Sequence, residues 1–279
     1  MNTSAAKVCV IGHPIGHSRS PIIHNYWMKR HNIAAEYGKQ DVTPEALPVF
    51  IAGLAANGYR GCNVTLPHKV AALALTQPDD RARAVGAANT LWLDGGAVRS
   101  TNTDVEGFVG NLDASAPGWD RNLKRAIVLG AGGGAQGVVF GLLERKVPEI
   151  LVVNRKLARA QELAQRFGGG VRAAAWDDIS ALLSSAGLLV NTTSVGMKGE
   201  GTLPIDFSKA TDNLVVNDIV YIPLETGLLK AARARGLRTA DGLGMLLHQA
   251  VRGFSLWFGV KPQVTPELRA LVEADLAKA

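Results

Sequence analysis

The chain has 279 residues, of which 47% are hydrophobic and 19% are charged, which excludes a disordered protein and allows one or two domains with a substantial core. Its net charge of +6 could indicate nucleic-acid binding, but no dense basic run typical of that function occurs. The charge therefore indicates either an ordinary basic surface or a preference for small anionic ligands. Two cysteines without metal-ligand spacing, no signal peptide and no apolar run of about 18 residues predict a cytoplasmic protein without metal, nucleic-acid partner or membrane span.

Strand-like and helix-like segments alternate along the chain. Strands are predicted at 7–12, 36–42, 61–66, 89–94, 125–130, 149–155, 187–194 and 213–221. Helical patterns cover 44–58 and 155–168, the polar stretch 114–124 is predicted as a connection, and the last forty residues are predicted to be helical. This alternation predicts an α/β fold with mostly parallel sheets.

The first strand leads into "GHPIGHSRSP", residues 12–21, which precedes an apolar helical pattern. Ser20 before Pro21 is typical of a helix N-cap, so Ser20 is predicted either as that cap or as a ligand-binding residue. A cap does not account for Ser18, and two hydroxyls at the positive end of a helix predict a site for a substrate carboxylate. Three nearby histidines lack the pattern of a metal site and are interpreted as structural or rim residues: His13, His17 and His24.

The stretch "CNVTLPHK", residues 62–69, repeats this arrangement. A strand ends at Asn63 and Thr65, Pro67 is predicted to start a helix, and Lys69 falls in its first turn. The helix dipole at this position favours the neutral amine, which suits a proton donor or acceptor. A solvent-exposed lysine without a chemical role is the alternative.

Two further loops, "GAANT" at 86–90 and "STNTDVEGF" at 100–108, place Asn89 and Asp104 after or between predicted strands. Asp104 is predicted either to cap the following helix or to orient the amine of Lys69 and share its proton. Because ligands of open α/β sheets bind outside the carboxyl ends of the strands, these polar strand ends predict a binding site.

The stretch "RAIVLGAGGGAQG", residues 125–137, places a glycine turn between a strand and a helix. Gly130, Gly132 and Ala135 fit G-x-G-x-x-[G/A], in which the glycines allow a tight turn and close approach of a pyrophosphate, and the small third residue packs helix against strand. Because the helix N-terminus adds free N–H groups, the stretch predicts dinucleotide binding. A structural glycine turn is the alternative.

The next strand ends at Asn154, Arg155 and Lys156, where an NAD site usually has Asp or Glu. Since a carboxylate repels a 2′-phosphate and cations bind it, the strand end predicts NADP(H). The alternative, a solvated helix start, is opposed by the unfavourable position of cations at a helix N-terminus.

Together the motifs resemble the shikimate dehydrogenase family over almost the full chain, in the order "GHPIGHSRSPIIHN", "NVTLPHK", "GAANT", "NTDVEGF", "LGAGGGAQG", "NRKLARA", "NTTSVGM", "NDIVYIPLET" and "GLGMLLHQA". The resemblance implies a substrate-binding domain at 1–106 and 242–279 and a Rossmann-like NADP-binding domain at 107–241. It also implies reversible, NADPH-dependent reduction of 3-dehydroshikimate to shikimate, a reaction of chorismate and aromatic amino acid biosynthesis.

The resemblance further implies roles for individual residues. Lys69 would be the acid/base, paired with Asp104, and Ser18 and Ser20 would hold the substrate carboxylate with help from Tyr221. The ring hydroxyls would be bound by Asn63, Thr65, Asn89, Asp104 and Gln249. The cofactor would be held by Gly130, Ala131, Gly132, Gly133, Gly134, Ala135, Asn154, Arg155, Lys156, Thr192, Met197, Ile219, Gly242 and Met245.

The sequence departs from the family pattern at Lys156, where threonine is common, and at His248, where a small residue is common. Three other functions are compatible with the motifs: a quinate/shikimate dehydrogenase with relaxed cofactor use, a reductase of another small cyclic acid such as an aminoshikimate, and a non-catalytic ligand sensor. The sensor is disfavoured because such a protein should lack Lys69 or Asp104. A monomer and a homodimer are both compatible with the sequence.

Overall fold

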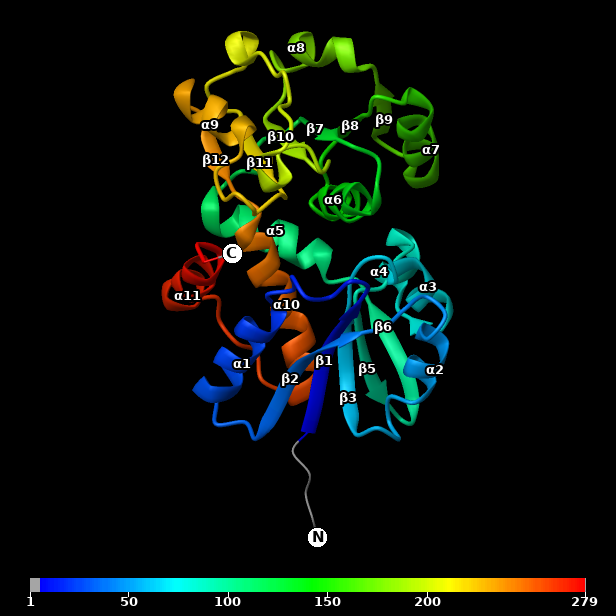
Figure 1. Ribbon diagram of the computed structural model, residues 1–279. Helices are drawn as coiled ribbons and strands as arrows, with labels where there is room; N and C mark the ends of the chain where they lie inside the picture. The colour runs from blue at the N-terminus through cyan, green and yellow to red at the C-terminus, as the bar shows by residue number, and fades with distance from the viewer. Residues whose placement is uncertain (1–5, 279) are drawn as a thin grey trace. The chain divides into compact units, whose positions relative to one another are not determined.

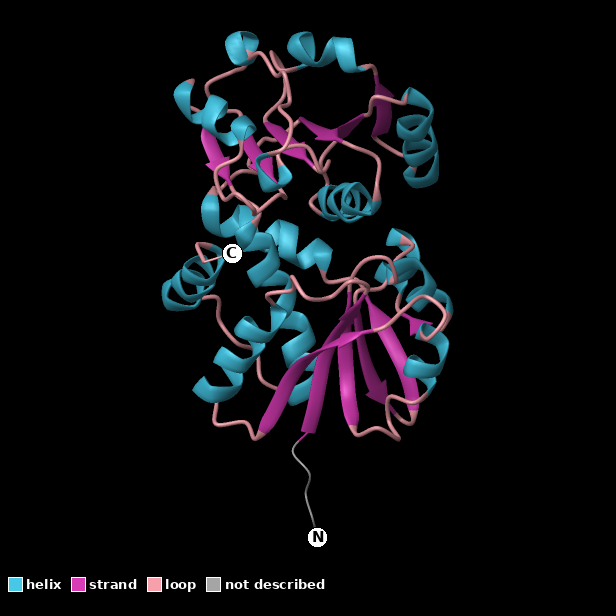
Figure 2. Cartoon of the chain, in the orientation of Figure 1, coloured by secondary structure: helices cyan, strands magenta, loops and turns pink. Residues whose placement is uncertain are grey.

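The computed structural model describes residues 6–278 and divides the chain into two compact units (Figures 1 and 2). The first unit contains the residues up to Thr103 and those from Gln249 onward, and the second runs from Asp104 to His248. Helix α10 (Leu243–Phe258) contributes residues to both. The domain borders drawn from the sequence, after 106 and before 242, stay a prediction.

The first unit is built on a six-stranded sheet of order β2-β1-β3-β5-β6-β4. Its strands are β1 (Ala6–Gly12), β2 (Ala35–Asp41), β3 (Tyr59–Val64), β4 (Gln77–Pro78), β5 (Thr90–Asp94) and β6 (Ala97–Thr101). Strands β2, β1 and β3 are parallel, whereas β5 is antiparallel to both β3 and β6. The four strands predicted here are present, and β4 and β6 were missed.

Helices cover both faces of this sheet (Figure 1). They are α1 (Ser20–Arg30), α2 (Leu47–Ala52), α3 (Lys69–Ala74), α4 (Asp80–Val85) and α11 (Pro266–Leu276), together with the end of α10. Residues of α2 and α3 such as Leu47 and Ala72 pack on one face against Cys9 and Cys62. The helix predicted over 44–58 is much shorter in the structure, because α2 ends at Ala52 and turns follow from Gly53.

The second unit is built on an all-parallel sheet of order β12-β11-β10-β7-β8-β9. Its strands are β7 (Arg125–Leu129), β8 (Glu149–Val153), β9 (Val171–Ala174), β10 (Leu188–Asn191), β11 (Val215–Asp218) and β12 (Arg238–Ala240). Counted from β7, this is the order 3-2-1-4-5-6 of dinucleotide-binding folds, whose ligand crevice lies where the strand order reverses, between β7 and β10. The α/β prediction is confirmed, and only β9 and β12 were missed in this unit.

Two apolar cores lie on the two faces of this sheet. One packs α5 (Asp104–Ser115), α6 (Gly133–Glu144) and α7 (Leu157–Phe167) against β7, β8 and β10. The other packs α8 (Ile179–Leu182), α9 (Gly227–Ala234) and the short 3₁₀ helix η3 (Phe207–Lys209) on the opposite face. Two more 3₁₀ helices, η1 (Trp176–Asp178) and η2 (Met197–Gly199), lie in connections. Within residues 6–278, no helix has the length and apolarity to span a membrane.

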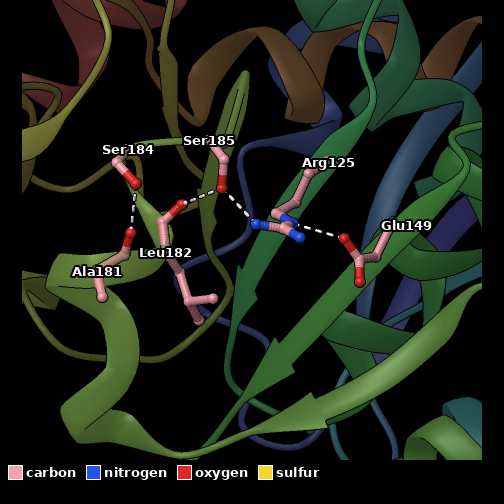
Figure 3. Close-up of polar contacts among 6 residues, drawn as sticks. All are labelled: Arg125, Glu149, Ala181, Leu182, Ser184 and Ser185. Atoms are coloured by element: carbon pink, nitrogen blue, oxygen red, sulfur yellow. Dashed lines mark hydrogen bonds and ion pairs between the residues drawn. The ribbon is translucent and has the colours of Figure 1, made fainter.

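The amino ends of the strands in this unit are joined by polar contacts (Figure 3). The guanidinium of Arg125 donates 2.5 Å to Glu149 at the start of β8 and also donates to the hydroxyl of Ser185. Ser185 in turn donates 3.3 Å to the carbonyl of Leu182. This cluster lies at the amino ends of β7 and β8, whereas the glycine turn follows the carboxyl end of β7. Its contacts align β7, β8 and the segment before β10.

Candidate functional site

In the first unit, polar residues meet where β3 ends and the antiparallel β5 begins. Asn63 is paired in register with Thr90, and the N–H of Asn89 donates 3.1 Å to the carbonyl of Thr101 at the end of β6. Because β5 is antiparallel to β3, the amino end of β5 lies beside the carboxyl end of β3. This is why loops separated in the sequence supply one polar cluster. The expectation that all these residues follow the carboxyl ends of parallel strands is wrong for Asn89, which precedes the amino end of the antiparallel β5.

The side chain of Asn63 is buried and fully engaged on its amide nitrogen. Its Nδ2 donates 3.0 Å to Thr90 Oγ1 and 3.3 Å to the Asn89 carbonyl, while its Oδ1 accepts a 2.6 Å hydrogen bond from the hydroxyl of Tyr37. Burying an amide costs free energy unless its donors and acceptors find partners. Here those partners also fix the direction of the amide.

A second amide, Asn89, is held by Thr103. Its Oδ1 accepts from the N–H of Thr103 at 2.7 Å and from the Thr103 hydroxyl at 3.1 Å. Thr103 Oγ1 also lies 3.4 Å from Gln249 Oε1 on α10 and 3.1 Å from Thr90 Oγ1. The structure therefore brings Asn63, Asn89 and Gln249 into one buried network and adds three residues that the sequence did not identify: Tyr37, Thr90 and Thr103.

The paired serines form a small hydroxyl cluster at the start of α1. Ser18 Oγ lies 3.3 Å from Ser20 Oγ and accepts a 3.3 Å hydrogen bond from the N–H of Ser20. The cap position of α1 is Arg19, with no side-chain cap, so the interpretation of Ser20 as the N-cap is wrong. Arg19 itself reaches Asp275 of α11, with Nε 2.5 Å from Oδ2, which ties this loop to the last helix.

Lys69 is the first residue of α3 and is half-buried. Its carbonyl accepts a 2.9 Å hydrogen bond from Ala88, so the backbone of α3 is joined to the loop that precedes Asn89. Thr65, also half-buried, precedes it, and its N–H bonds the carbonyl of Ile11 at 2.9 Å. Asp104 is the first residue of α5, in the second unit, so its pairing with Lys69 stays a prediction.

The glycine turn follows β7 as predicted. Gly130 has φ +105°, and a Cβ there would lie 2.7 Å from Thr192 Oγ1, so glycine is required for the turn. The N–H of Gly130 bonds the carbonyl of Val153 at 2.8 Å, which joins the ends of β7 and β8. Thr192 Oγ1 donates 2.7 Å to the carbonyl of Leu129 from the other side, so three neighbouring strand ends shape the turn.

The start of α6 fits a dinucleotide phosphate. Helix α6 begins at Gly133 after the cap residue Gly132, and no side chain caps its N–H groups. A Cβ at Gly132 or Gly133 would find no atom within 4 Å, so the space above the turn is open. Gly134 and Ala131 are half-buried, whereas Ala135 is fully buried against the core. Open N–H groups at a helix start bind phosphate.

The end of β8 carries cations and no carboxylate. Asn154 Nδ2 donates 2.9 Å to the carbonyl of Lys156, which closes the turn into α7. Arg155 and Lys156 are exposed beside this turn. The donor set fits the 2′-phosphate of NADP, because two exposed cations attract a phosphate that a carboxylate at this strand end would repel.

The remaining predicted cofactor residues follow β10, β11 and β12. Met197 begins η2 and is 45% exposed, Ile219 follows β11 with its N–H 3.1 Å from the carbonyl of Asn191, and Tyr221 is half-buried two residues later. Gly242 precedes α10, where a Cβ would lie 2.3 Å from the Ile219 carbonyl. Met245 packs on the core beside α6.

A buried carboxylate links two of these segments, and it was not among the predicted residues. Asp218, fully buried at the end of β11, accepts from Asn191 Nδ2 at 2.9 Å, from the N–H of Val220 at 3.0 Å and from the hydroxyl of Thr226 at 2.7 Å. Burial raises the pKa of Asp218, and these donors act in the opposite direction. An acid inside the apolar stretch "LVVNDIV" is a signal that was available in the sequence.

Two histidines, His248 and His24, pack against neighbouring residues and are not arranged as metal ligands. The ring of His248 packs beside Gly110 of α5, and burial lowers the pKa of His248. The histidine that departs from the family pattern therefore fills space against α5. His24 is fully buried among aromatic rings. Among the residues that the structure describes, no group of three or more His, Cys, Asp or Glu side chains is arranged to hold a metal ion.

Comparison with known proteins agrees with this arrangement. Residues 10–91 match the model of the shikimate dehydrogenase substrate binding domain, residues 115–198 that of shikimate / quinate 5-dehydrogenase, and residues 242–271 that of the shikimate 5′-dehydrogenase C-terminal domain. A shikimate dehydrogenase (NADP(+)) of Rhodopseudomonas palustris strain TIE-1 is 62% identical over 277 residues, covering 99% of each chain.

Two solved structures share the fold over nearly the whole chain. The shikimate 5-dehydrogenase of Thermus thermophilus, in complex with NADP(H) and shikimate, has a TM-score of 0.85 and 34% identity and covers 98% of this chain and 99% of that one. The quinate dehydrogenase of Corynebacterium glutamicum, in complex with NAD, has a TM-score of 0.88 and 31% identity and covers 97% and 99%. The predicted resemblance is thus confirmed by sequence and by fold: the chain belongs to the shikimate dehydrogenase family.

Proposed function

We propose that the protein is an NADP-dependent shikimate dehydrogenase, which interconverts 3-dehydroshikimate and shikimate in the biosynthesis of chorismate and aromatic amino acids. The observation that carries this proposal is 62% identity along 99% of the chain to a shikimate dehydrogenase (NADP(+)). The cation pair after β8 supports the choice of cofactor, because it stands where an NAD site has a carboxylate.

The first unit is proposed to bind and orient the ring acid. Ser18 and Ser20 would donate their hydroxyls to the carboxylate, with Tyr221 as a further donor. Asn63, Thr65, Asn89, Asp104 and Gln249 would take the ring hydroxyls. The rigidity of this set supports the assignment, since side chains held by fixed partners position a substrate without further loss of conformational freedom.

Lys69 is proposed as the acid/base, with Asp104 orienting its amine and sharing its proton. A ketone that is reduced develops an alkoxide, and a positioned ammonium donates the proton that this oxygen needs. In the reverse direction the neutral amine accepts the proton from the hydroxyl. The half-buried position of Lys69 at the start of α3 supports this role, because the backbone of α3 is joined there to the loop that precedes Asn89.

The second unit is proposed to hold the cofactor. When bound, NADPH supplies the hydride for the ketone carbon. The N–H groups at the start of α6 would bind the pyrophosphate beside Gly130, Ala131, Gly132, Gly133, Gly134 and Ala135. Arg155 and Lys156, next to Asn154, would bind the 2′-phosphate, and Thr192, Met197, Ile219, Gly242 and Met245 would line the nicotinamide end.

The decisive assay measures the absorbance of reduced nicotinamide when the purified protein is mixed with shikimate and NADP⁺. Parallel reactions contain NAD⁺ in place of NADP⁺ and quinate in place of shikimate. The proposal expects turnover of shikimate with NADP⁺ and much weaker turnover in the other combinations. Equal or faster turnover of quinate with NAD⁺ would favour a quinate/shikimate dehydrogenase, the second candidate, which the fold of the Corynebacterium glutamicum quinate dehydrogenase supports.

Location and assembly are also proposals. The two cysteines are free and buried, which supports a reducing compartment such as the cytoplasm. Either a monomer or a homodimer acting on a small-molecule substrate is compatible with the chain, and light scattering on the purified protein at several concentrations decides between them.

A further inference from the structure

Tyr37 contacts the predicted substrate residues although it belongs to no motif of the family resemblance. It lies in the middle of β2 with 2% of its surface exposed. Strand β1 lies between β2 and β3, so the Tyr37 side chain extends over β1 to reach β3. Its hydroxyl donates a 2.6 Å hydrogen bond to Asn63 Oδ1. This is the shortest of the three hydrogen bonds to the Asn63 amide.

The two ends of the Asn63 amide are identified by their partners. One end lies 3.3 Å from the carbonyl of Asn89, and a carbonyl only accepts. That end must therefore be the nitrogen, and the end facing Tyr37 must be the oxygen. Because both Nδ2 hydrogens have acceptors in Thr90 and Asn89, any further donor meets the amide at Oδ1, which accepts; the buried His24 ring also interacts with this amide.

The neighbouring amide is fixed with the opposite polarity. Asn89 Oδ1 accepts from the backbone N–H of Thr103, which only donates. The far end of this amide is therefore Nδ2, a donor. A hydroxyl group is both donor and acceptor, so an acceptor on Asn63 and a donor on Asn89 together match the polarity of substrate hydroxyls.

The ring of Tyr37 is stacked on the ring of His24. The two rings are stacked, with centroids 4.2 Å apart and planes 3° from parallel, and Trp257 lies 6.0 Å from the phenol on another side. Burial raises the pKa of Tyr37 well above its usual range, so the phenol keeps its proton and remains a donor. The phenol thus has neither the freedom to turn away nor a tendency to ionise.

We propose that Tyr37 is a positioning residue for the substrate site, which fixes Asn63 so that Oδ1 is presented as an acceptor to a ring hydroxyl of the substrate. This role rests on the proposed function. Without the phenol hydroxyl, the Oδ1 end loses the partner that opposes rotation of the amide. Recognition of one substrate hydroxyl then weakens, whereas cofactor binding, which belongs to the second unit, is unaffected.

The first test compares Tyr37→Phe with wild type. Tyr37→Phe removes one oxygen and keeps the ring, and we expect KM for shikimate to rise by about five- to tenfold, the equivalent of one lost hydrogen bond to a fixed amide. The KM for NADP⁺ and the affinity for NADP⁺, measured by titration calorimetry, are expected to stay within twofold. Tyr59→Phe is the matched control, because Tyr59 lies in β3 of the same sheet and packs on Phe50 without touching the network.

The second test uses shikimate analogues that each lack one ring hydroxyl other than the one oxidised. If Tyr37 acts through Asn63 on one hydroxyl, the ratio of KM between Tyr37→Phe and wild type falls towards one for the analogue lacking that hydroxyl and stays high for the other. Thr90→Val, which removes the acceptor on the nitrogen side of Asn63, is expected to give the same pattern and serves if Tyr37→Phe does not fold.

Each outcome has one meaning. A wild-type protein that does not oxidise shikimate refutes the proposed function and, with it, this role. An active wild type with a Tyr37→Phe variant that melts earlier but keeps KM within twofold shows a purely structural phenol and overturns the inference alone. A rise in KM that is equal for shikimate and for both analogues also overturns it, because the effect then does not pass through one hydroxyl.

Discussion

The burial of His24 has a measurable consequence for stability in mild acid. Burial lowers the pKa of His24 to about 3, while the nearby Asn63 amide acts in the opposite direction. In the unfolded chain a histidine has a pKa of about 6.5. Between these values the unfolded state binds a proton that the native state does not, so the stability present above about pH 6.5 is lost as the pH falls. The slope is about 1.4 kcal/mol per pH unit, and integration from pH 7 to pH 5 gives a loss of about 2 kcal/mol from this one group.

The assay is urea unfolding at pH 7 and pH 5, followed by tryptophan fluorescence, for wild type and His24→Phe. Phenylalanine keeps a ring stacked on Tyr37 and removes the titrating group. Other groups also titrate in this range, so the quantity of interest is the difference between the two proteins, and the pH-dependent loss should be smaller by about 2 kcal/mol in His24→Phe. His31→Phe, at the exposed end of the same helix, is the control and should behave as wild type. An equal loss in His24→Phe and wild type would show that His24 is protonated in the native state at pH 5 and would refute the reasoning.

Three further predictions concern single side chains. Lys69→Ala should lower kcat by orders of magnitude and change shikimate binding little, as measured by steady-state kinetics and calorimetry; near-normal turnover would end its assignment as the acid/base. Arg155→Ala should raise KM for NADPH far more than KM for NADH, and an equal rise for both would contradict a 2′-phosphate contact. Thr226→Val removes one donor to the buried Asp218 and the cap of α9, which together cost roughly 2–4 kcal/mol. Its melting temperature should fall well below that of Thr226→Ser, which keeps the hydroxyl, and identical melting of the two variants would count against this network.

The central strands of both sheets were predictable because their residues form continuous apolar runs between turn signals. The four missed strands are short or weakly patterned. β4 has two residues, β12 has three, and β9, "VRAA", has one buried residue. β6 follows a turn at Gly95 and Gly96 and does not alternate exposed and buried residues. Such elements depend on pairing with a neighbour, which a single segment does not encode.

The positions of the candidate site residues were partly predictable for a different reason. Ser18, Asn63 and Asn89 follow or precede strands, and polar residues at strand ends are visible in the sequence. Tyr37 was not visible, because a tyrosine inside a strand is an ordinary core residue until the register of β2 and β3 across β1 brings its hydroxyl to Asn63. Long-range geometry of this kind comes from sheet order, which only the folded chain supplies. The helix cap assigned to Ser20 failed because the turn before α1 places Arg19 at the cap position instead.

Under the proposed function, the two units would select their ligands by different physical means. In the first unit the partners of Asn63 and Asn89 are neutral, and backbone groups fix which end of each amide donates and which accepts. Recognition of the substrate there would depend on the direction of hydrogen bonds in a buried setting, where an unmatched group costs free energy and salt has little effect. In the second unit the residues proposed to select the cofactor are exposed cations, Arg155 and Lys156, whose attraction for a phosphate is long-ranged and screened by salt. If these assignments hold, a new pattern of substrate hydroxyls requires new polarity inside a packed network, whereas a new cofactor preference requires only a change of charge at one exposed turn. We therefore expect cofactor preference to be the property that substitution alters at the smaller cost to the fold.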